Sequence, residues 1–272
     1  MSTHYLKLND GTLAYDDTGG NGPLVVMLPS LGDVRHEYRF VAGPLARAGY
    51  RVVALDMRGH GESSPNWPDY SLAAIGSDIL ALVDHLQAGP ATVVATSYPA
   101  GAAVWAAAEN PAAVRALVLI GAFVRNAPSS ALQKAVIRLL FGGPWQVRAW
   151  DLFYKSLYPS RQPDDFARYR QQLRANLSQP GRFAAVKAMI YAPRDDSERR
   201  LAQVRSPALV LMGSKDPDFP DPTAEARFIA GALGGEFRIL EGAGHYPHAE
   251  MPEQALPLLN EFLAKVAQPH AA

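Results

Sequence analysis

Short apolar runs alternate with amphipathic stretches along most of this chain. Four runs, rich in Val and Leu and without helical periodicity, cover 23–28, 50–55, 91–95 and 116–120. They are apolar on both faces, which is typical of strands covered by helices on two sides. Helix-like patterns separate them at 38–48, 71–87 and 100–109. This alternation predicts a parallel sheet with right-handed crossovers.

The two ends of the chain extend this sheet. Segments 5–8 and 12–15 flank Asn9-Asp10-Gly11, which predicts a hairpin at one edge. Near the other end, strands are expected at 208–212 and 237–240, and helices at 223–233 and 252–266.

The alternation is interrupted between 124 and 205. That segment has helical fragments with many aromatic residues, broken by prolines, and no clear strand. We therefore predict three parts: 1–123 as the first part of the core, 124–205 as an inserted helical cap, and 206–272 as the second part of the core.

Composition narrows the functional classes. The chain has 272 residues, 48% of them hydrophobic, and its 26 basic and 26 acidic residues give a formal net charge of zero. A chain of this length buries a sizeable core, and the absence of charge blocks argues against nucleic acid as a partner. Without cysteine there is no disulfide, thiolate metal site or cysteine nucleophile. No signal pattern or bilayer-length apolar run is present, so we expect a cytoplasmic protein without a membrane span.

Ser97 is the candidate nucleophile. It interrupts an apolar run and is followed by an Ala-rich helical pattern, as expected for a serine held on a sharp strand-to-helix turn. A serine hydroxyl needs a base, and the base needs an acid partner. Asp216 and His245 each follow a further apolar run, so parallel strands would bring all three residues to one rim of the sheet. Asp218 is the alternative acid.

Two backbone amides are candidates for an oxyanion hole. One is the amide of Tyr98, directly after the nucleophile, although Pro99 is expected to bias Tyr98 away from helical angles. The other lies in the loop 29–33, where Leu31 is the first choice and Ser30 the second.

The string 56–63, Asp-Met-Arg-Gly-His-Gly-Glu-Ser, is the most distinctive short sequence. It lacks the spacing of a phosphate-binding loop, so nucleotide binding is not expected. We predict a structural turn in which Asp56 pairs with Arg58. Structural rather than catalytic roles are expected for His60 and His248.

These pieces together resemble the α/β-hydrolase-fold family over essentially the whole chain. The resemblance rests on the loop 29–33, the string 56–63, the Ser97 turn, Gly213-Ser214-Lys215-Asp216 and Gly242-Ala243-Gly244-His245. It implies an α/β fold with a mostly parallel eight-stranded sheet, helices on both faces and a cap after the sixth strand. It also implies Ser97 as nucleophile, Asp216 as acid and His245 as base. The sequence departs from the common G-x-S-x-G pattern at Pro99 and from the common His-Gly at Pro29-Ser30.

The function expected from these residues is a serine esterase that acts on small carboxylic esters and needs no cofactor or metal. Aromatic residues of the cap would line its pocket, and the candidate substrate-binding residues are Ser30, Trp145, Trp150 and Phe153. The same triad also serves cofactor-free perhydrolases or haloperoxidases, lactonases and carbon–carbon bond hydrolases. A receptor-like binding protein with little turnover, and a homodimeric state, are left open.

Overall fold

A computed structural model describes residues 2–126 and 130–267. Within them, the sheet has eight strands in the order β1-β2-β4-β3-β5-β6-β7-β8. The pairs β1–β2 and β2–β4 are antiparallel and the others are parallel, which confirms the predicted mostly parallel α/β sheet. The strands are β1 (Ser2–Leu8), β2 (Gly11–Asp17), β3 (Leu24–Leu28), β4 (Arg51–Leu55), β5 (Ala91–Thr96), β6 (Val114–Ile120), β7 (Ala208–Gly213) and β8 (Glu236–Leu240).

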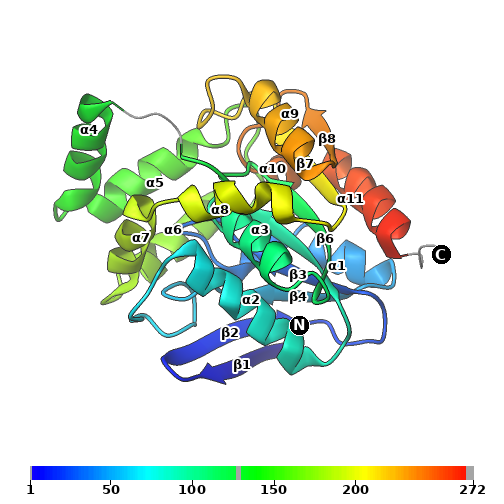
Figure 1. Cartoon of the computed structure of the whole chain (residues 1–272). Helices are drawn as coiled ribbons and strands as arrows, with labels where there is room; N and C mark the ends of the chain where they lie inside the picture. Colours follow the sequence, from blue (N-terminus) through cyan, green and yellow to red (C-terminus); the bar gives the residue numbers. More distant parts are fainter. Residues whose placement is uncertain (1, 127–129, 268–272) are drawn as a thin grey trace.

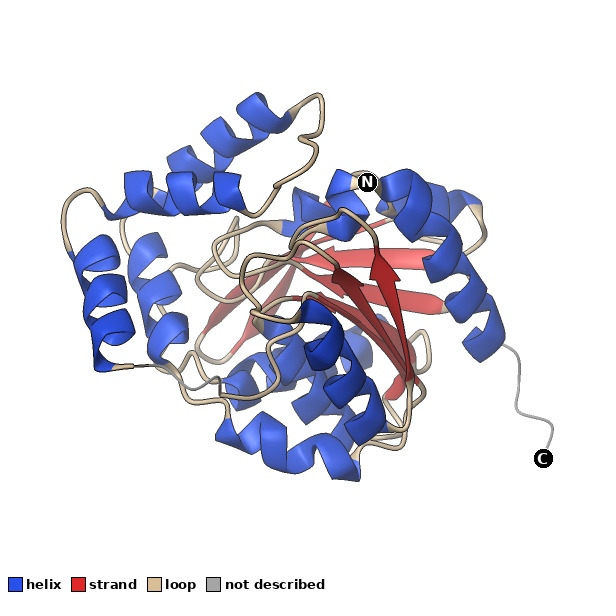
Figure 2. Ribbon diagram, turned by 90° about the horizontal axis from the view of Figure 1, so that it is seen from above, coloured by secondary structure: helices blue, strands red, loops and turns tan. Residues whose placement is uncertain are grey.

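Helices cover both faces of the sheet because successive strand residues point to opposite sides. In β3, Val25 and Met27 pack with α1 (Ala42–Arg47) and α11 (Pro252–Ala267). On the opposite face, Val26 and Leu28 belong to the cluster that includes α2 (Leu72–Leu86), α3 (Pro99–Glu109) and α9 (Pro222–Leu233). Two buried apolar layers therefore enclose the parallel strands, and Figure 2 shows the helices on either side.

The helix expected at 38–48 is divided in the structure. A 3-10 turn spans Arg35–Tyr38, and α1 begins only at Ala42. Pro44 has no N–H to donate to the preceding turn, so it is tolerated near the start of a helix but not within one that begins at 38. Tyr38 is instead anchored to the sheet, where its hydroxyl donates to the Leu28 carbonyl at 2.6 Å.

The segment 124–205 is helical where it is described. Its helices are α4 (Ala131–Gly142), α5 (Gln146–Ser156), α6 (Phe166–Leu177), α7 (Arg182–Tyr191) and α8 (Asp195–Arg200). Figure 1 shows α4 to α7 grouped beyond one end of the sheet. In contrast, α8 lies against α3, where the Ser197 hydroxyl donates to the Gly101 carbonyl at 3.0 Å. The short helix α10 (Pro247–Glu250) packs with aromatic residues of α5 and α6.

Candidate active site

Ser97 occupies a strained turn between β5 and α3. Its φ is +67°, in the left-handed region that residues other than glycine seldom adopt. The turn is fixed to the neighbouring strand, since the Ser97 amide donates to the Ile120 carbonyl at 2.7 Å. The Ser97 carbonyl in turn accepts the Phe123 amide at 3.2 Å. Such a conformation persists where surrounding contacts impose it, and it is the geometry expected of a nucleophilic serine that follows a strand.

Tyr98 does not follow the prediction that Pro99 would keep it out of helical angles. Its φ of −54° and ψ of −48° are helical, and Pro99 is the first residue of α3. The first turn is closed by hydrogen bonds from the Ala100 amide to the Ser97 carbonyl and from the Gly101 amide to the Tyr98 carbonyl. These bonds outweigh the steric preference that a proline imposes on the residue before it.

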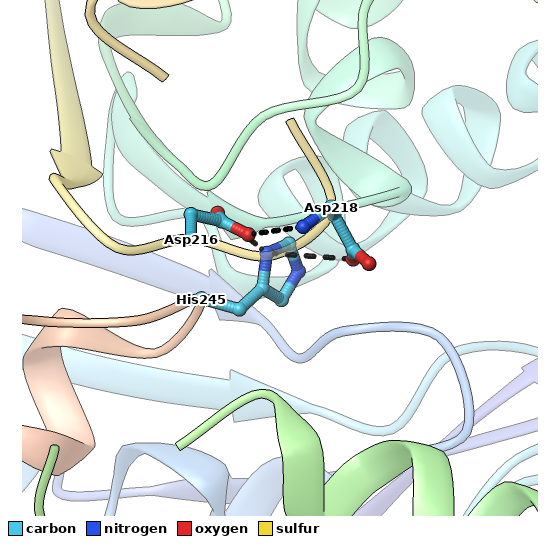
Figure 3. A group of neighbouring side chains, drawn as sticks. All are labelled: Asp216, Asp218 and His245. Carbon is cyan, nitrogen blue, oxygen red and sulfur yellow. Dashed lines mark hydrogen bonds and ion pairs between the residues drawn. The ribbon is translucent and has the colours of Figure 1, made fainter. Parts of the chain in front are cut away.

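His245 and Asp216 form a buried pair at the ends of the neighbouring loops (Figure 3). Nδ1 of His245 lies 2.8 Å from Oδ2 of Asp216, and both residues are almost fully buried. The alternative acid, Asp218, has Oδ2 at 3.7 Å from the same nitrogen, and its amide donates to Asp216 Oδ1. The closer carboxylate is therefore the one predicted as the acid.

The carboxylates determine the protonation of the imidazole. Burial disfavours a charged ring, but Asp216, with a smaller contribution from Asp218, outweighs it and raises the pKa of His245 to about 9. An anionic partner of this kind stabilises an imidazolium, which is the state a general base reaches after it takes a proton.

The ring of His245 is placed beside the carboxyl end of β6. Gly121, with φ +52°, gives it room, because a Cβ there would lie 2.9 Å from Cε1 of the imidazole. The Phe123 ring is 6.1 Å from the imidazole. No hydrogen bond joins Ser97 Oγ to His245 within residues 2–126 and 130–267, and such contacts often tighten only when substrate binds.

The histidine loop is also bound to the segment after α5. The His245 amide donates to the Leu157 carbonyl at 3.0 Å. The buried Glu250 carboxylate accepts the amides of Gly244 at 2.6 Å, Ser160 at 2.9 Å and Arg161 at 2.8 Å. Nothing in the sequence pattern pointed to Glu250, whose partners at 160 and 161 are far away in the chain.

The loop after β3 has one free amide. Ser30 donates to Glu37 Oε2 at 2.7 Å, Gly32 to His60 Nε2 at 3.1 Å, and Asp33 to the Ser30 carbonyl at 3.1 Å. Within the described part of the chain, no acceptor is found for the amide of Leu31 or for that of Tyr98. These two donors are the ones proposed from sequence for the oxyanion.

A buried polar network supports this loop. Asp33 accepts hydrogen bonds from the hydroxyls of Tyr154 and Tyr169, and burial raises its pKa to about 7. Burial likewise raises the pKa of Glu37 to about 8. The Ser30 hydroxyl accepts a hydrogen bond from Tyr246 at 2.9 Å. The loop is thereby attached to α5, α6 and the histidine loop.

The string 56–63 has a different pairing from the one predicted. Asp56 forms an ion pair with Arg35, whereas Arg58 pairs with Asp78 at 2.7 Å. The prediction of an Asp56–Arg58 pair is therefore wrong, because each of these side chains forms its ion pair with a residue of another element. His60 is buried, and burial lowers its pKa to about 4, so it is neutral while it holds the Gly32 amide.

The three aromatic pocket candidates lie in different environments. Trp150 is buried against the loop after β3, where a Cβ on Gly32 would lie 2.5 Å from its indole. Phe153 is half-buried and packs on Trp150 at 5.5 Å between ring centroids. Trp145 is 49% exposed, and its indole N–H donates to the Leu139 carbonyl. Of these candidates, Trp150 therefore lies against the loop after β3, whereas Trp145 is an exposed residue of the helical segment.

None of the helices within residues 2–126 and 130–267 combines the length and apolar character needed to cross a bilayer. Among the described residues, side chains that could together hold a metal ion come close to one another at Asp216, Asp218 and His245. In this group, Nδ1 of His245 is already hydrogen-bonded to Asp216.

Comparison with known proteins agrees with this geometry. A family model described as "alpha/beta hydrolase fold" matches residues 23–252. A 2-hydroxy-6-oxononadienedioate/2-hydroxy-6-oxononatrienedioate hydrolase of Paraburkholderia xenovorans is 28% identical, and the match covers 95% of this chain and 93% of that protein. Two solved structures, a bromoperoxidase from Bacillus anthracis and an esterase from a Rhodococcus species, superpose with TM-scores of 0.82 and 0.80. Their identities are 20% and 22%, over 97% and 98% of this chain and all of theirs. The chain therefore belongs to the α/β-hydrolase family.

Proposed function

We propose that this protein is a serine hydrolase that cleaves carboxylic esters through an acyl-enzyme on Ser97. The observation that carries the proposal is the buried Asp216–His245 pair, together with a serine held at positive φ after a central strand. In this family such an arrangement serves nucleophilic attack on an acyl carbon.

In the first half of the reaction, Ser97 Oγ attacks the ester carbonyl carbon while His245 Nε2 takes the hydroxyl proton. The negative oxygen that forms is stabilised by the free amides of Leu31 and Tyr98. When the tetrahedral intermediate collapses, the bond to the alcohol breaks and His245 returns the proton to that alcohol. Asp216 orients the ring and stabilises its charge throughout.

In the second half, a water molecule replaces the alcohol. His245 takes a proton from the water, which attacks the acyl carbon. Collapse then releases the carboxylic acid and returns the proton to Ser97. We assign the helices α4 to α7 as the cap over this site, with Trp150 and Phe153 as the apolar wall next to the loop after β3. No cofactor is needed for any step.

The proposal predicts that Ser97→Ala abolishes ester turnover. Removal of a triad nucleophile lowers kcat by several orders of magnitude, about 10⁶-fold where it has been measured in a serine protease. Hydrolysis of p-nitrophenyl acetate, butyrate and octanoate by both proteins measures this, together with intact mass after treatment with a fluorophosphonate. One adduct is expected on the wild type and none on the variant.

Equal rates in the two proteins, with no adduct, would remove Ser97 as the nucleophile. Assays of lactone opening, carbon–carbon bond hydrolysis and peracid formation with the same two proteins separate ester hydrolysis from the other reactions that the scaffold supports. Ser97-dependent turnover confined to one of those substrates would replace the ester assignment with that reaction.

A further inference from the structure

The guanidinium of Arg194 lies near the nucleophile without a carboxylate partner. Its contacts within the described residues are two aromatic rings, with the guanidinium carbon 5.4 Å from the centroid of Tyr98 and 5.5 Å from that of Phe123. Its Nε is buried and has no hydrogen-bond acceptor. Arg194 is partly exposed, and burial of part of its side chain lowers its pKa from the usual value. A partly buried cation without an anionic partner is costly to maintain.

The neighbouring acidic groups do not neutralise this charge. Glu225 is held by Arg125, and Asp196 pairs with Arg199 and Arg200. Asp195, next in the chain, and Glu198, one helical turn further on, are exposed, and neither forms an ion pair with Arg194 within the described residues. The undescribed stretch 127–129 near Asn126 has the sequence Ala-Pro-Ser and thus contains no acid.

Both rings under the guanidinium belong to the environment of Ser97. Tyr98 directly follows the nucleophile and supplies one of the two free amides. Phe123 donates its amide to the Ser97 carbonyl and packs its ring 6.1 Å from that of His245. The Asn126 side chain accepts the Arg194 amide at 3.1 Å, which fixes the backbone from which the cation extends. An anion on the guanidinium would therefore lie one side chain away from the reacting serine.

We propose that Arg194 binds a carboxylate carried by the substrate, so that the preferred substrates are esters with a free acid group, such as half-esters of dicarboxylic acids. A planar guanidinium donates two parallel hydrogen bonds to a carboxylate, and it does so most strongly where water is excluded. The inference rests on the proposed esterase function, because it names the substrate class of that site.

The test compares matched anionic and neutral esters. The carboxylate is placed on the acyl side in p-nitrophenyl hydrogen glutarate, against p-nitrophenyl pentanoate, and on the alcohol side in 4-acetoxybenzoate, against phenyl acetate. The wild type is expected to prefer the anionic member of at least one pair. Arg194→Met is expected to lower that kcat/KM ratio at least about tenfold, the loss typical of a charge-assisted hydrogen bond. Arg194→Lys should recover part of it.

Arg125→Met is the matched control. Arg125 is also an arginine with its guanidinium over an aromatic ring, that of Phe228 at 3.7 Å, but it is paired with Glu225. Its replacement should leave the ratio within about twofold of the wild-type value, as expected for a partly exposed pair away from the substrate. An unchanged ratio in Arg194→Met, or an equal change in Arg194→Met and Arg125→Met, would overturn the inference.

A binding measurement keeps the inference testable if ester turnover is absent. Glutarate should raise the melting temperature of the Ser97→Ala protein in a concentration-dependent way, because a ligand of the native state stabilises it. Pentanoate at the same ionic strength should raise it less, and Arg194→Met should abolish the difference. A glutarate effect that persists in Arg194→Met contradicts the carboxylate site, whatever reaction the enzyme performs.

Discussion

Two carboxylates flank Nδ1 of His245, and they have different effects on the ring. Asp216 is at hydrogen-bonding distance, 2.8 Å, whereas Asp218 is at 3.7 Å and acts through its charge alone. At the scale of single residues, we expect Asp216 to orient the proposed base and Asp218 to adjust the pH at which that base is neutral.

We predict that Asp218→Asn moves the acidic limb of the kcat/KM profile to lower pH. A general base acts in its neutral form, so a raised pKa of His245, about 9, places this limb above the ordinary histidine value. Removing one negative charge lowers that pKa and frees the ring at a lower pH. Ester hydrolysis measured from pH 5 to pH 10 tests this. A limb that stays in place or moves upward would contradict it.

Asp216→Asn provides the contrast in the same assay. It removes the hydrogen-bonded acid rather than a distant charge, so we expect kcat to fall by about 10⁴-fold, as it does when a triad acid is replaced by its amide. If Asp218→Asn produced the larger loss, the roles of the two aspartates would have to be exchanged.

At the scale of elements, hydrogen bonds join the helical segment to the histidine loop of the proposed catalytic site. Glu250 at the end of α10 accepts one amide from the histidine loop and two from the connection between α5 and α6. The Glu250 carboxylate thus holds the histidine loop against the connection between α5 and α6.

Glu250→Gln should loosen this junction. The amide side chain presents an NH₂ group to at least one of the three backbone donors, and a buried donor left without an acceptor costs about 1–3 kcal/mol of unfolding free energy. We expect a loss of that size in denaturant unfolding, together with a lower kcat. Glu253→Gln, which removes an exposed ion pair with Arg161, is the control and should change stability by less than about 1 kcal/mol. Equal effects of the two replacements would argue against the junction.

At the scale of the whole molecule, buried titratable groups give stability a definite pH dependence. The pKa values of His245, Glu37 and Asp33 are raised in the folded protein, to about 9, 8 and 7. Those of His60 and His248 are lowered, to about 4 and 3. Below pH 6.5 the two sets act in opposite directions. Above it His60 and His248 lose their remaining protons in the unfolded chain as well, and the raised groups then dominate the difference in proton binding between the folded and unfolded chains.

The free energy of unfolding should therefore fall as the pH rises from 6.5 to 9. In this window the native state binds more protons than the unfolded chain, whose carboxyl groups titrate near pH 4 and whose histidines titrate near 6.5. The stabilisation tied to each raised group is complete below its unfolded pKa and is lost as the pH passes its folded value. Urea unfolding at half-unit intervals measures the slope. A flat or rising curve between pH 7 and 9 would show that these groups are not shifted as described.

Much of the fold could be predicted because it follows from local patterns of apolar and polar residues in the sequence. The parallel strands other than β8 are largely apolar runs, and the turn at Ser97 follows from its position between β5 and a helix that begins at Pro99. Less local features were missed. Asp56 and Arg58 are neighbours in the chain, yet each is paired 20 or 21 residues away. Glu250 and Ser160 are separated by 90 positions. Such partners are brought together by tertiary packing, and the periodicity of the sequence gives no sign of them.

The hydrogen bond from His245 to the Leu157 carbonyl has a consequence for protein engineering. Exchange of 124–205 for the corresponding helices of a relative would treat that segment as a module, but the segment supplies the acceptor for the backbone amide of His245, the proposed base. Gly244 fits so tightly there that a Cβ would lie 2.3 Å from the same carbonyl oxygen. A functional chimera must therefore keep residues 157–161 of this chain, or else take residues 242–250 from the relative that supplies the helices. In either case both sides of the contact come from the same parent protein.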